Sequence, residues 1–591
     1  MDPEKVTYFA QTDARNRRER FGIKAKDRTK HMYVIGKTGM GKSTLLENMA
    51  IQDVQNGEGI TFIDPHGASA EKLLDYVPEN RIQDVLYFAP FDLDYPIGFN
   101  IMEDVEPDKR HFIVAGLMST FEKIWADAWS ARMSYILQNT LHALIEYPDA
   151  TLLDVNRMYT NKSFRDAVVA NIQDVSVRSF WTEEFTKYTD RYTQEATPAI
   201  QNKIGQLAAN PLIRNIVGQP KSTFDVRKMM DERKILIVNL SKGRVGEGNA
   251  MLLGSMMVNK IYLSAMSRAD TPTRELEHLP QFYLYVDEFQ NFANKSFADI
   301  LSESRKYKLN LTIAHQYIEQ MEEEVRAAVF GNVGTMITFR VGAYDAEVLE
   351  KEFAPKFFAQ DLVNLGFTQI YLKLMIDGVS SEPFSATTLL PIPVPEISYT
   401  HQVIEASRKT YARSRADVEA FIEERHAVQK NNDGSQDKNG GGGRMNGSAA
   451  RRAPRERTDE RSDRPRRVNP QKQVFSEMEP SNHKEQLTEI AKTIGGGERE
   501  RPKPMPKKDK SPANSENKDA LRAALAGVMG AQKEAALPSK EEKTNMPRQQ
   551  GVKHDTKQES APSEPRQGTE AKEVPENVLK NILNVNKEDA G

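Results

Sequence analysis

The sequence predicts an α/β fold in which a mostly parallel β-sheet is covered by helices on both faces. Short apolar segments alternate with amphipathic ones through the first 400 residues, as strands and their covering helices do. One long stretch, 107–230, shows helical apolar periodicity with little strand signal and predicts an all-α insertion. A glycine-rich turn at 36–43 separates an apolar strand from a helix, which is the context of a phosphate-binding loop.

Buried strands are expected where short apolar runs lie between turn signals. "HMYVIG" precedes the glycine-rich turn, and "KSTLLENMAIQDVQNG" after it has a helical pattern. An Asp377-Gly378 turn predicts a hairpin within "IYLKLMIDGVSSEPFSATTL". The expected strands are 31–36, 59–64, 84–90, 234–241, 282–288, 309–316 and 335–341.

The composition changes abruptly after residue 430. From there on the chain has no Trp or Tyr and a single Phe, Phe475, among Gly, Pro, Ser and charged residues. Such a stretch buries too little apolar surface to offset chain entropy, so we expect it to be disordered. Two short segments, 517–535 and 576–585, have helical patterns and are either transient helices or motifs that fold on a partner.

These patterns divide the chain of 591 residues into six parts. The predicted parts are a basic N-terminal segment (1–24), the first part of the α/β domain (25–106), an all-α insertion domain (107–230), the second part of the α/β domain (231–400), a terminal helix (401–429) and a disordered charged tail (430–591).

Composition narrows the class of protein. The chain has no cysteine, which excludes disulfides, thiol nucleophiles and Cys-ligated zinc and fits a reducing compartment. No apolar run is long enough to cross a bilayer, and the first 20 residues lack an apolar signal region. We therefore expect a cytoplasmic protein that reaches a membrane only through partners.

"GKTGMGKS" matches the phosphate-loop pattern G-x-x-x-x-G-K-[ST]. Its glycines let backbone N–H groups point at phosphate, Lys42 supplies a positive charge, and Ser43 offers a hydroxyl to Mg²⁺. The strand before it and the helix after it make a chance glycine-rich turn a poor alternative. The expected nucleotide-binding residues are Gly36, Lys37, Thr38, Gly39, Met40, Gly41, Lys42, Ser43 and Thr44.

"FYLYVDEF" carries a strand to two acidic residues, Asp287 and Glu288. Ligands of open α/β sheets bind at the carboxyl ends of strands. Asp287 is therefore the expected Mg²⁺ partner, together with Ser43, and Glu288 is placed to orient or deprotonate an attacking water. An Asp-Glu pair that caps the next helix is the alternative. The phosphate loop in the same domain favours hydrolysis.

Two residues of "LSESRKYKLNLTIAHQ" are candidates for the same chemistry. Gln316 ends a strand expected beside the one that carries Asp287, where an amide can bond both γ-phosphate and water. Arg305 lies on the connecting helix, away from its own subunit's nucleotide, and spacing alone favours a plain surface position for it. An arginine there fits catalysis if it completes a neighbour's site, where its charged fork would stabilise the transition state. The alternative for Arg305 is a solvated helix end.

These motifs resemble the HerA/FtsK superfamily of ring-forming P-loop ATPases, and most closely the TraG/TraD-type coupling proteins of type IV secretion and conjugation. The resemblance covers about 25–390. It is carried by "GKTGMGKS", "ITFIDPHG", "FNIM", "ILIVNLSKGRVGEGNAMLLG", "YLYVDEFQNF" and "LSESRKYKLNLTIAHQ".

The resemblance implies a RecA-like motor with an inserted all-α domain, hexameric assembly, and DNA translocation driven by ATP and Mg²⁺. It assigns Lys42 and Ser43 to the Walker A motif and Asp287 and Glu288 to the Walker B motif. It makes Gln316 the sensor and Arg305 a trans-acting arginine finger. Arg340 in "TMITFRVG" also recurs in such sequences, without an assigned role. In "DPHG", Asp64 and His66 are expected to be structural and not metal ligands.

Coupling proteins commonly carry N-terminal transmembrane helices, whereas this chain has about 30 polar residues there. We expect a soluble, cytoplasmic form without direct membrane insertion, located at the inner membrane only through partners. A relaxase or secretion-channel protein is the partner that this type implies. An N-terminal β-barrel, usual in HerA-type repair helicases, has no room in this chain.

Cations cluster twice, with a single aromatic residue, Phe21, among them. Contact with a phosphate backbone and a solvating surface are equally compatible with both clusters. The loop 241–249, with Lys242 and Arg244, is either a DNA-gripping pore loop or a simple connector. The clustered residues are Arg15, Arg17, Arg18, Arg20, Lys24, Lys26, Arg28 and Lys30, and, within 451–467, Arg452, Arg455, Arg457, Arg461, Arg464 and Arg466.

Three functions are compatible with these sequence features. The first is a ring-forming, ATP-driven translocase of single- or double-stranded DNA, of the coupling type. The second is a HerA-like helicase that works with a nuclease in DNA repair. The third, a DNA-binding scaffold that does not hydrolyse ATP, is disfavoured by the complete set of Lys42, Asp287, Glu288, Gln316 and Arg305.

Overall fold

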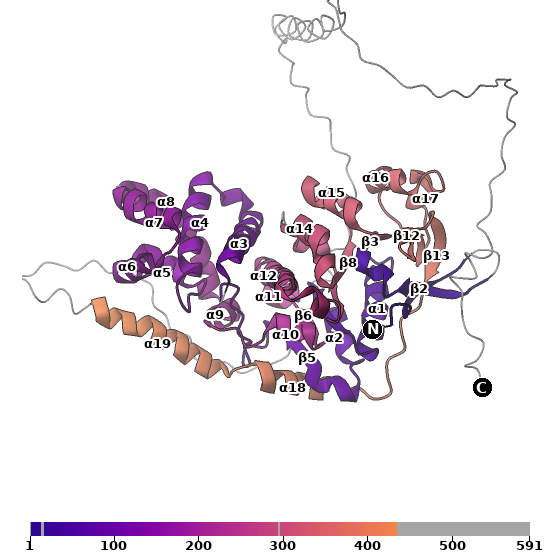
Figure 1. The fold of residues 1–591 in the computed structure, drawn as a ribbon, viewed down its shortest axis with the longest axis horizontal. Coiled ribbons are helices and arrows are strands. Elements are labelled where there is room, and N and C mark those ends of the chain that lie inside the picture. The colour runs from indigo at the N-terminus through magenta and orange to yellow at the C-terminus, as the bar shows by residue number, and fades with distance from the viewer. Residues whose placement is uncertain (1, 14–16, 104, 189, 294–295, 434–591) are drawn as a thin grey trace, which may run out of the picture. The chain divides into compact units, whose positions relative to one another are not determined.

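One mixed β-sheet of eleven strands organises the part of the chain that the computed structural model describes (Figure 1). The described residues are 2–13, 17–103, 105–188, 190–293 and 296–433. The strands follow the order β2-β1-β13-β10-β9-β3-β8-β7-β4-β6-β5, and a separate two-stranded ladder joins β11 to β12.

Seven neighbouring strands of this sheet are parallel. All seven were predicted from apolar runs, and each lies within its predicted range. Nearly every residue in them is buried, because helices cover both faces of a parallel sheet. In sheet order they are β9 (Thr335–Thr338), β3 (Met32–Ile35), β8 (Leu309–His315), β7 (Phe282–Val286), β4 (Gly59–Asp64), β6 (Ile235–Asn239) and β5 (Val85–Phe88).

The other four strands extend the sheet as an antiparallel edge: β10 (Gln369–Lys373), β13 (Phe384–Thr388), β1 (Val6–Gln11) and β2 (Arg20–Lys24). The predicted hairpin is confirmed. Its Asp377-Gly378 turn has φ of 51° and 82° and joins β11 (Met375–Ile376) to β12 (Val379–Ser380). Positive φ at both central residues is what a two-residue type I′ hairpin turn requires.

Alternate residues of the central strand β3 enter two different cores. Met32 and Val34 pack with Leu45 and Met49 of α1 (Lys42–Gln55), the helix that follows the phosphate loop. Tyr33 and Ile35, which point to the other face, belong to the core that includes the helical insertion. The sheet is thus covered on both sides, as predicted.

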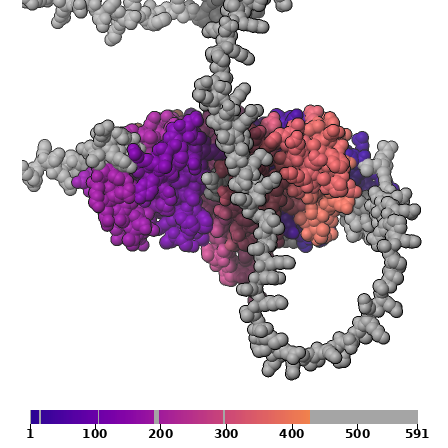
Figure 2. All heavy atoms as spheres, turned by 90° about the horizontal axis from the view of Figure 1, so that it is seen from above, coloured from indigo at the N-terminus to yellow at the C-terminus, as the bar shows by residue number. Residues whose placement is uncertain are grey.

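Only helices and turns occur in the described part of 107–230, which confirms the predicted all-α content. The apolar core of these helices is continuous with one face of the sheet, and α3 packs against α12 (Glu247–Met266). The side chains of this helical block gather as one mass in the space-filling view (purple, Figure 2). The helices are α3 (Arg110–Ile124), α4 (Ala131–Ile145), α5 (Asp154–Thr160), α6 (Lys162–Asn171), α7 (Val175–Ser179), α8 (Asp190–Ala209), α9 (Pro211–Val217) and α10 (Val226–Asp231).

Residues 401–429 form two helices where the sequence predicted one. The chain turns away from helical geometry at Ala412, which bridges to Ile97 in an isolated antiparallel contact, and Arg413 N–H donates to the Pro96 carbonyl at 3.2 Å. These two helices are α18 (Thr400–Tyr411) and α19 (Arg415–Asp433).

The remaining α-helices outside the helical block belong to the α/β domain, as do α1 and α12. They are α2 (Ala68–Leu74), α11 (Lys242–Val245), α13 (Thr273–Leu276), α14 (Ser296–Glu303), α15 (Glu323–Asn332), α16 (Ala343–Phe353) and α17 (Ala359–Val363).

Residues 1–24, expected as a separate basic segment, contribute β1 and β2 to the main sheet. The cations Lys24 and Lys26 lie close to Glu4 and Asp377, with Lys24 Nζ 2.9 Å and Lys26 Nζ 2.8 Å from Asp377 Oδ1. These contacts tie β2 to the β11–β12 turn. They favour a structural role for Lys24 and Lys26 over contact with phosphate.

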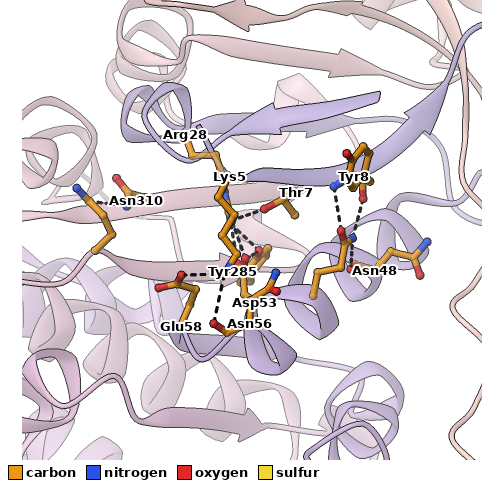
Figure 3. Close-up of polar contacts among 12 residues, drawn as sticks. Lys5, Thr7, Tyr8, Arg28, Asn48, Asp53, Asn56, Glu58, Tyr285 and Asn310 are labelled. Atoms are coloured by element: carbon orange, nitrogen blue, oxygen red, sulfur yellow. Dashed lines mark hydrogen bonds and ion pairs between the residues drawn. The ribbon is translucent and has the colours of Figure 1, made fainter. Parts of the chain in front are cut away.

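Arg28, another member of the basic cluster, is 2% exposed. Its guanidinium donates to both carboxylate oxygens of Asp53 at 2.8 and 2.9 Å, to the Tyr285 hydroxyl at 2.6 Å and to Thr7 at 3.1 Å (Figure 3). The Tyr283 ring lies 3.7 Å below it. One buried ion pair therefore joins the N-terminal strand β1, the phosphate-loop helix α1 and the strand β7.

The predicted disordered tail lies outside the described residues from position 434 onward, together with its two helical motifs and the 451–467 cation cluster. Across the described ranges, every helix is too short or too polar to span a bilayer.

We expect Asp53→Asn to lower the free energy of unfolding by about 3 to 5 kcal/mol, because it leaves the buried Arg28 charge without its carboxylate. The matched substitution Asp377→Asn removes an exposed partner of two lysines and should cost no more than about 1 kcal/mol. Urea unfolding followed by far-UV circular dichroism measures both. Equal losses in the two variants would contradict a structural role for the Arg28–Asp53 pair.

Candidate active site

Parallel pairing brings three predicted motifs to one edge of the sheet. Strand β8 lies between β3 and β7 and is parallel to both. The phosphate loop follows β3, Gln316 follows β8, and Asp287 with Glu288 follows β7. Since all three strands run in the same direction, these residues meet at the carboxyl edge, where ligands of open α/β sheets bind.

The phosphate loop is held open by two glycines in left-handed conformations, Gly39 with φ of 77° and Gly41 with φ of 111°. Lys42 begins α1 and is 4% exposed, and its ammonium donates to the Gly36 carbonyl at 2.7 Å and to the Lys37 carbonyl at 3.3 Å. Burial lowers the pKa of Lys42, opposed by the nearby carboxylates of Glu288 and Asp287. The ammonium therefore binds carbonyls of the phosphate loop itself, and it would have to leave them to bind a phosphate.

Neighbouring residues of the loop face different surroundings. Thr38 and Gly39 are exposed at its tip, Met40 is buried in the core that includes α1, and Thr44 is half-buried on that helix. The Lys37 N–H donates to the Arg340 carbonyl at 2.8 Å, which places Arg340 beside the loop, after β9. Arg340 therefore lies at the candidate site, a location that its sequence context alone did not show.

Ser43 and Asp287 form the candidate Mg²⁺ site. The Ser43 hydroxyl donates to Asp287 Oδ2 at 2.7 Å, and Asp287 is 2% exposed. Burial raises the Asp287 pKa to about 6; the Ser43 hydrogen bond lowers it, and the neighbouring Glu288 raises it. A hydroxyl and one carboxylate fit Mg²⁺, which takes few protein ligands and completes its shell with water and phosphate oxygens. The described residues contain no larger cluster of acidic or histidine side chains suited to a metal.

Glu288 is held on both carboxylate oxygens. Gln316 donates from Nε2 to Oε1, and Gln290 donates from Nε2 to Oε2 at 2.6 Å. The Gln316 amide oxygen in turn accepts from the Thr38 hydroxyl at 3.0 Å. Gln316 therefore bridges the phosphate loop and the Glu288 carboxylate.

Gln290 is a site residue that sequence analysis missed. It lies two residues after Glu288, and its contact depends on the backbone of Glu288, which has φ of 47° and ψ of 49°. A non-glycine residue in this left-handed region is disfavoured and often marks a functional site. No pattern of residue types signals such a conformation.

Asp64 uses its carboxylate within the fold, accepting backbone N–H groups of His66 at 2.7 Å, Ser69 at 2.9 Å and Ala70 at 3.0 Å. Lys242, from the candidate pore loop, donates to Asn291 Oδ1 at 2.7 Å, and Arg244 pairs with Glu71 at 3.1 Å. These contacts favour the connector interpretation of 241–249.

Arg305 lies at the opposite end of β8 from Gln316, on the short helix η9 (Ser304–Tyr307). The strand between them has seven residues, so the two positions are about 20 Å apart. The Arg305 side chain is exposed and has no hydrogen-bond or ion-pair partner among the described residues. The structure therefore does not bring Arg305 to the site of its own subunit.

Residues 21–353 match the family model described as the type IV secretion-system coupling protein DNA-binding domain. The chain belongs to this coupling-protein family. Among curated proteins, none matches this coupling-protein chain in sequence.

Three solved structures illustrate the structural neighbours of this coupling protein. The bacterial conjugative coupling protein TrwB, in an unbound form, is 14% identical, with 67% of this chain and 90% of that chain covered and a TM-score of 0.45. TrwB in complex with ADP and Mg²⁺ is 15% identical, with 64% and 89% covered and a TM-score of 0.46. VirB4 of Thermoanaerobacter pseudethanolicus is 12% identical, with 63% and 91% covered and a TM-score of 0.42.

We expect Gly36→Ala to abolish nucleotide binding, because a Cβ atom at this position would lie 2.5 Å from the Phe339 Cβ and force the phosphate loop to shift. Gly243→Ala is the matched control, since a Cβ there meets nothing within 4 Å. Titration with a fluorescent ATP analogue measures the affinity of both variants. Unchanged affinity in Gly36→Ala would contradict this geometry of the loop.

Proposed function

We propose that this coupling protein is an ATP-driven, ring-forming DNA translocase of the conjugative type that hydrolyses Mg·ATP between subunits. The observation that carries the proposal is the continuous set of contacts from Thr38 through Gln316 to Glu288, beside the Ser43–Asp287 pair. In this proposal, the groups that bind phosphate, bind the metal and activate water lie together at the carboxyl edge of the sheet. The family match supports the coupling type over the repair-helicase alternative.

Each residue has a distinct task in this proposal. Lys42 moves its ammonium from the Gly36 carbonyl to the β- and γ-phosphate oxygens. Ser43 and Asp287 would hold Mg²⁺, which would supply positive charge to neutralise those phosphates. Glu288 orients a water and takes its proton as the water oxygen bonds to the γ-phosphorus and the bond to the ADP oxygen breaks. Gln316 links the state of the γ-phosphate to Glu288.

The ring is part of the proposal because Arg305 lacks a role within its own subunit. It is exposed at the amino end of β8, while its own Gln316 is at the carboxyl end. An arginine finger must reach transition-state charge, so Arg305 would act in the site of a neighbour. We propose a homo-hexamer that passes DNA, single- or double-stranded, and docks on a relaxase or on secretion-channel proteins at the inner membrane.

Purified protein should hydrolyse ATP, and DNA should stimulate it. Lys42→Ala and Glu288→Gln should each lower kcat by about 100-fold or more, since each removes a group needed at the reacting phosphate. Glu288→Gln should still bind nucleotide. Lys306→Ala, on the exposed part of η9, is the control and should keep wild-type turnover; the absence of hydrolysis under every DNA condition would rule out the motor.

The finger can be tested by mixing subunits. Arg305→Ala alone should be inactive, and so should Glu288→Gln alone. In a mixed ring, an intact Glu288 site on one subunit can receive Arg305 from a Glu288→Gln neighbour, so a mixture should regain part of the wild-type turnover. A mixture that shows only the sum of the two variants would contradict the trans role.

A further inference from the structure

A half-buried lysine of the helical block reaches the Walker B loop. Lys123 lies in the last turn of α3, and its ammonium donates to the backbone carbonyls of Gln290 and Ala293, each at 2.6 Å. Both carbonyls belong to the segment that follows Glu288. Lys123 is therefore a direct polar link between the helical block and the loop of the candidate catalytic carboxylate.

Among the described residues, the Lys123 ammonium bonds to the two carbonyls and to no carboxylate. Burial lowers its pKa to about 8; the Lys242 cation also lowers it, and Glu322 raises it. Burying a cation is unfavourable unless it is well hydrogen-bonded. The two carbonyls provide those bonds, so the loop must keep its present path for the ammonium to stay satisfied.

The loop that Lys123 holds also fixes the Glu288 backbone. The Asn291 side chain donates to the Glu288 carbonyl at 2.8 Å and accepts from Lys242 at 2.7 Å. Gln290, whose carbonyl Lys123 binds, donates its own side-chain amide to Glu288 Oε2. The disfavoured left-handed conformation of Glu288 is thus supported by two side chains of the segment that follows it.

We propose that Lys123 is a positioning residue through which the helical block controls hydrolysis. By fixing the Gln290 and Ala293 carbonyls, it sets where Gln290 holds the Glu288 carboxylate. A displacement of α3 then changes the alignment of Glu288 toward water. This inference rests on the proposed ATPase function and adds the route by which a separate part of the chain regulates it.

The test separates turnover from nucleotide binding. Lys123→Met keeps the apolar stem and removes the charge. We expect kcat to fall by about 10- to 100-fold, because misplacing a catalytic group slows the reaction by about that factor. The affinity for a fluorescent ATP analogue should stay unchanged. Lys123→Arg restores donors to both carbonyls and should recover part of kcat. Lys109→Met is the control, since Lys109 belongs to the same helical block and pairs with the exposed carboxylates of Glu106 and Asp270 outside it.

Gln290→Ala provides a second measurement if Lys123→Met folds poorly. It removes the amide between the loop and Glu288, and should lower kcat without changing nucleotide affinity. The double variant Lys123→Met with Gln290→Ala should lose no more than the more damaging single variant, because both act through one route.

The outcomes distinguish this inference from the proposed function. Wild-type protein without ATP hydrolysis overturns the function itself. If the wild-type protein is active, three results overturn the role of Lys123 alone. The first is an unchanged kcat in Lys123→Met, and the second is an equal loss of kcat and nucleotide affinity in that variant. The third is additive losses of kcat in the double variant.

Discussion

The parallel hydrogen bonding of β3, β8 and β7 is the constraint on which the rest of the site depends. Three strands that run side by side in one direction must end at one edge, so residues far apart in the chain arrive together there. Thr38, Gln316 and Glu288 form a chain of contacts only because the strand ending in Gln316 is the middle one. Reversing or exchanging any of these strands would separate the phosphate loop from the carboxylates.

The packing beneath this edge keeps the three strands in place. The buried Arg28–Asp53 pair joins α1 to β7 through Tyr285, so the helix that follows the phosphate loop and the strand that carries the acidic residues share one polar anchor. On the other face of the sheet the helical block shares its apolar core with the strands. The site is therefore supported by an ion pair on one side and by an apolar core on the other.

The parallel strands and the main site residues could be predicted from the sequence because their signals are local. A fully buried strand is an apolar run, and "GKTGMGKS" requires its residue types at fixed spacing. Strand β1 was missed because it joins the sheet through β13, more than 370 positions away in the chain, and β2 was missed with it because β2 pairs only with β1. Arg28 resembled its solvated neighbours for the same reason, since its partners Asp53 and Tyr285 are distant in sequence. Gln290 depends on one backbone conformation, which residue types do not encode.

Strand β8 carries Gln316 at one end and is preceded by Arg305 at the other. In a ring these ends would belong to two different nucleotide sites, and a fully buried β-strand would connect them. A tilt of β8 would then move Gln316 in one site and Arg305 in the next site at the same time. In the proposed ring, a movement of this one buried strand would therefore be transmitted to two neighbouring nucleotide sites.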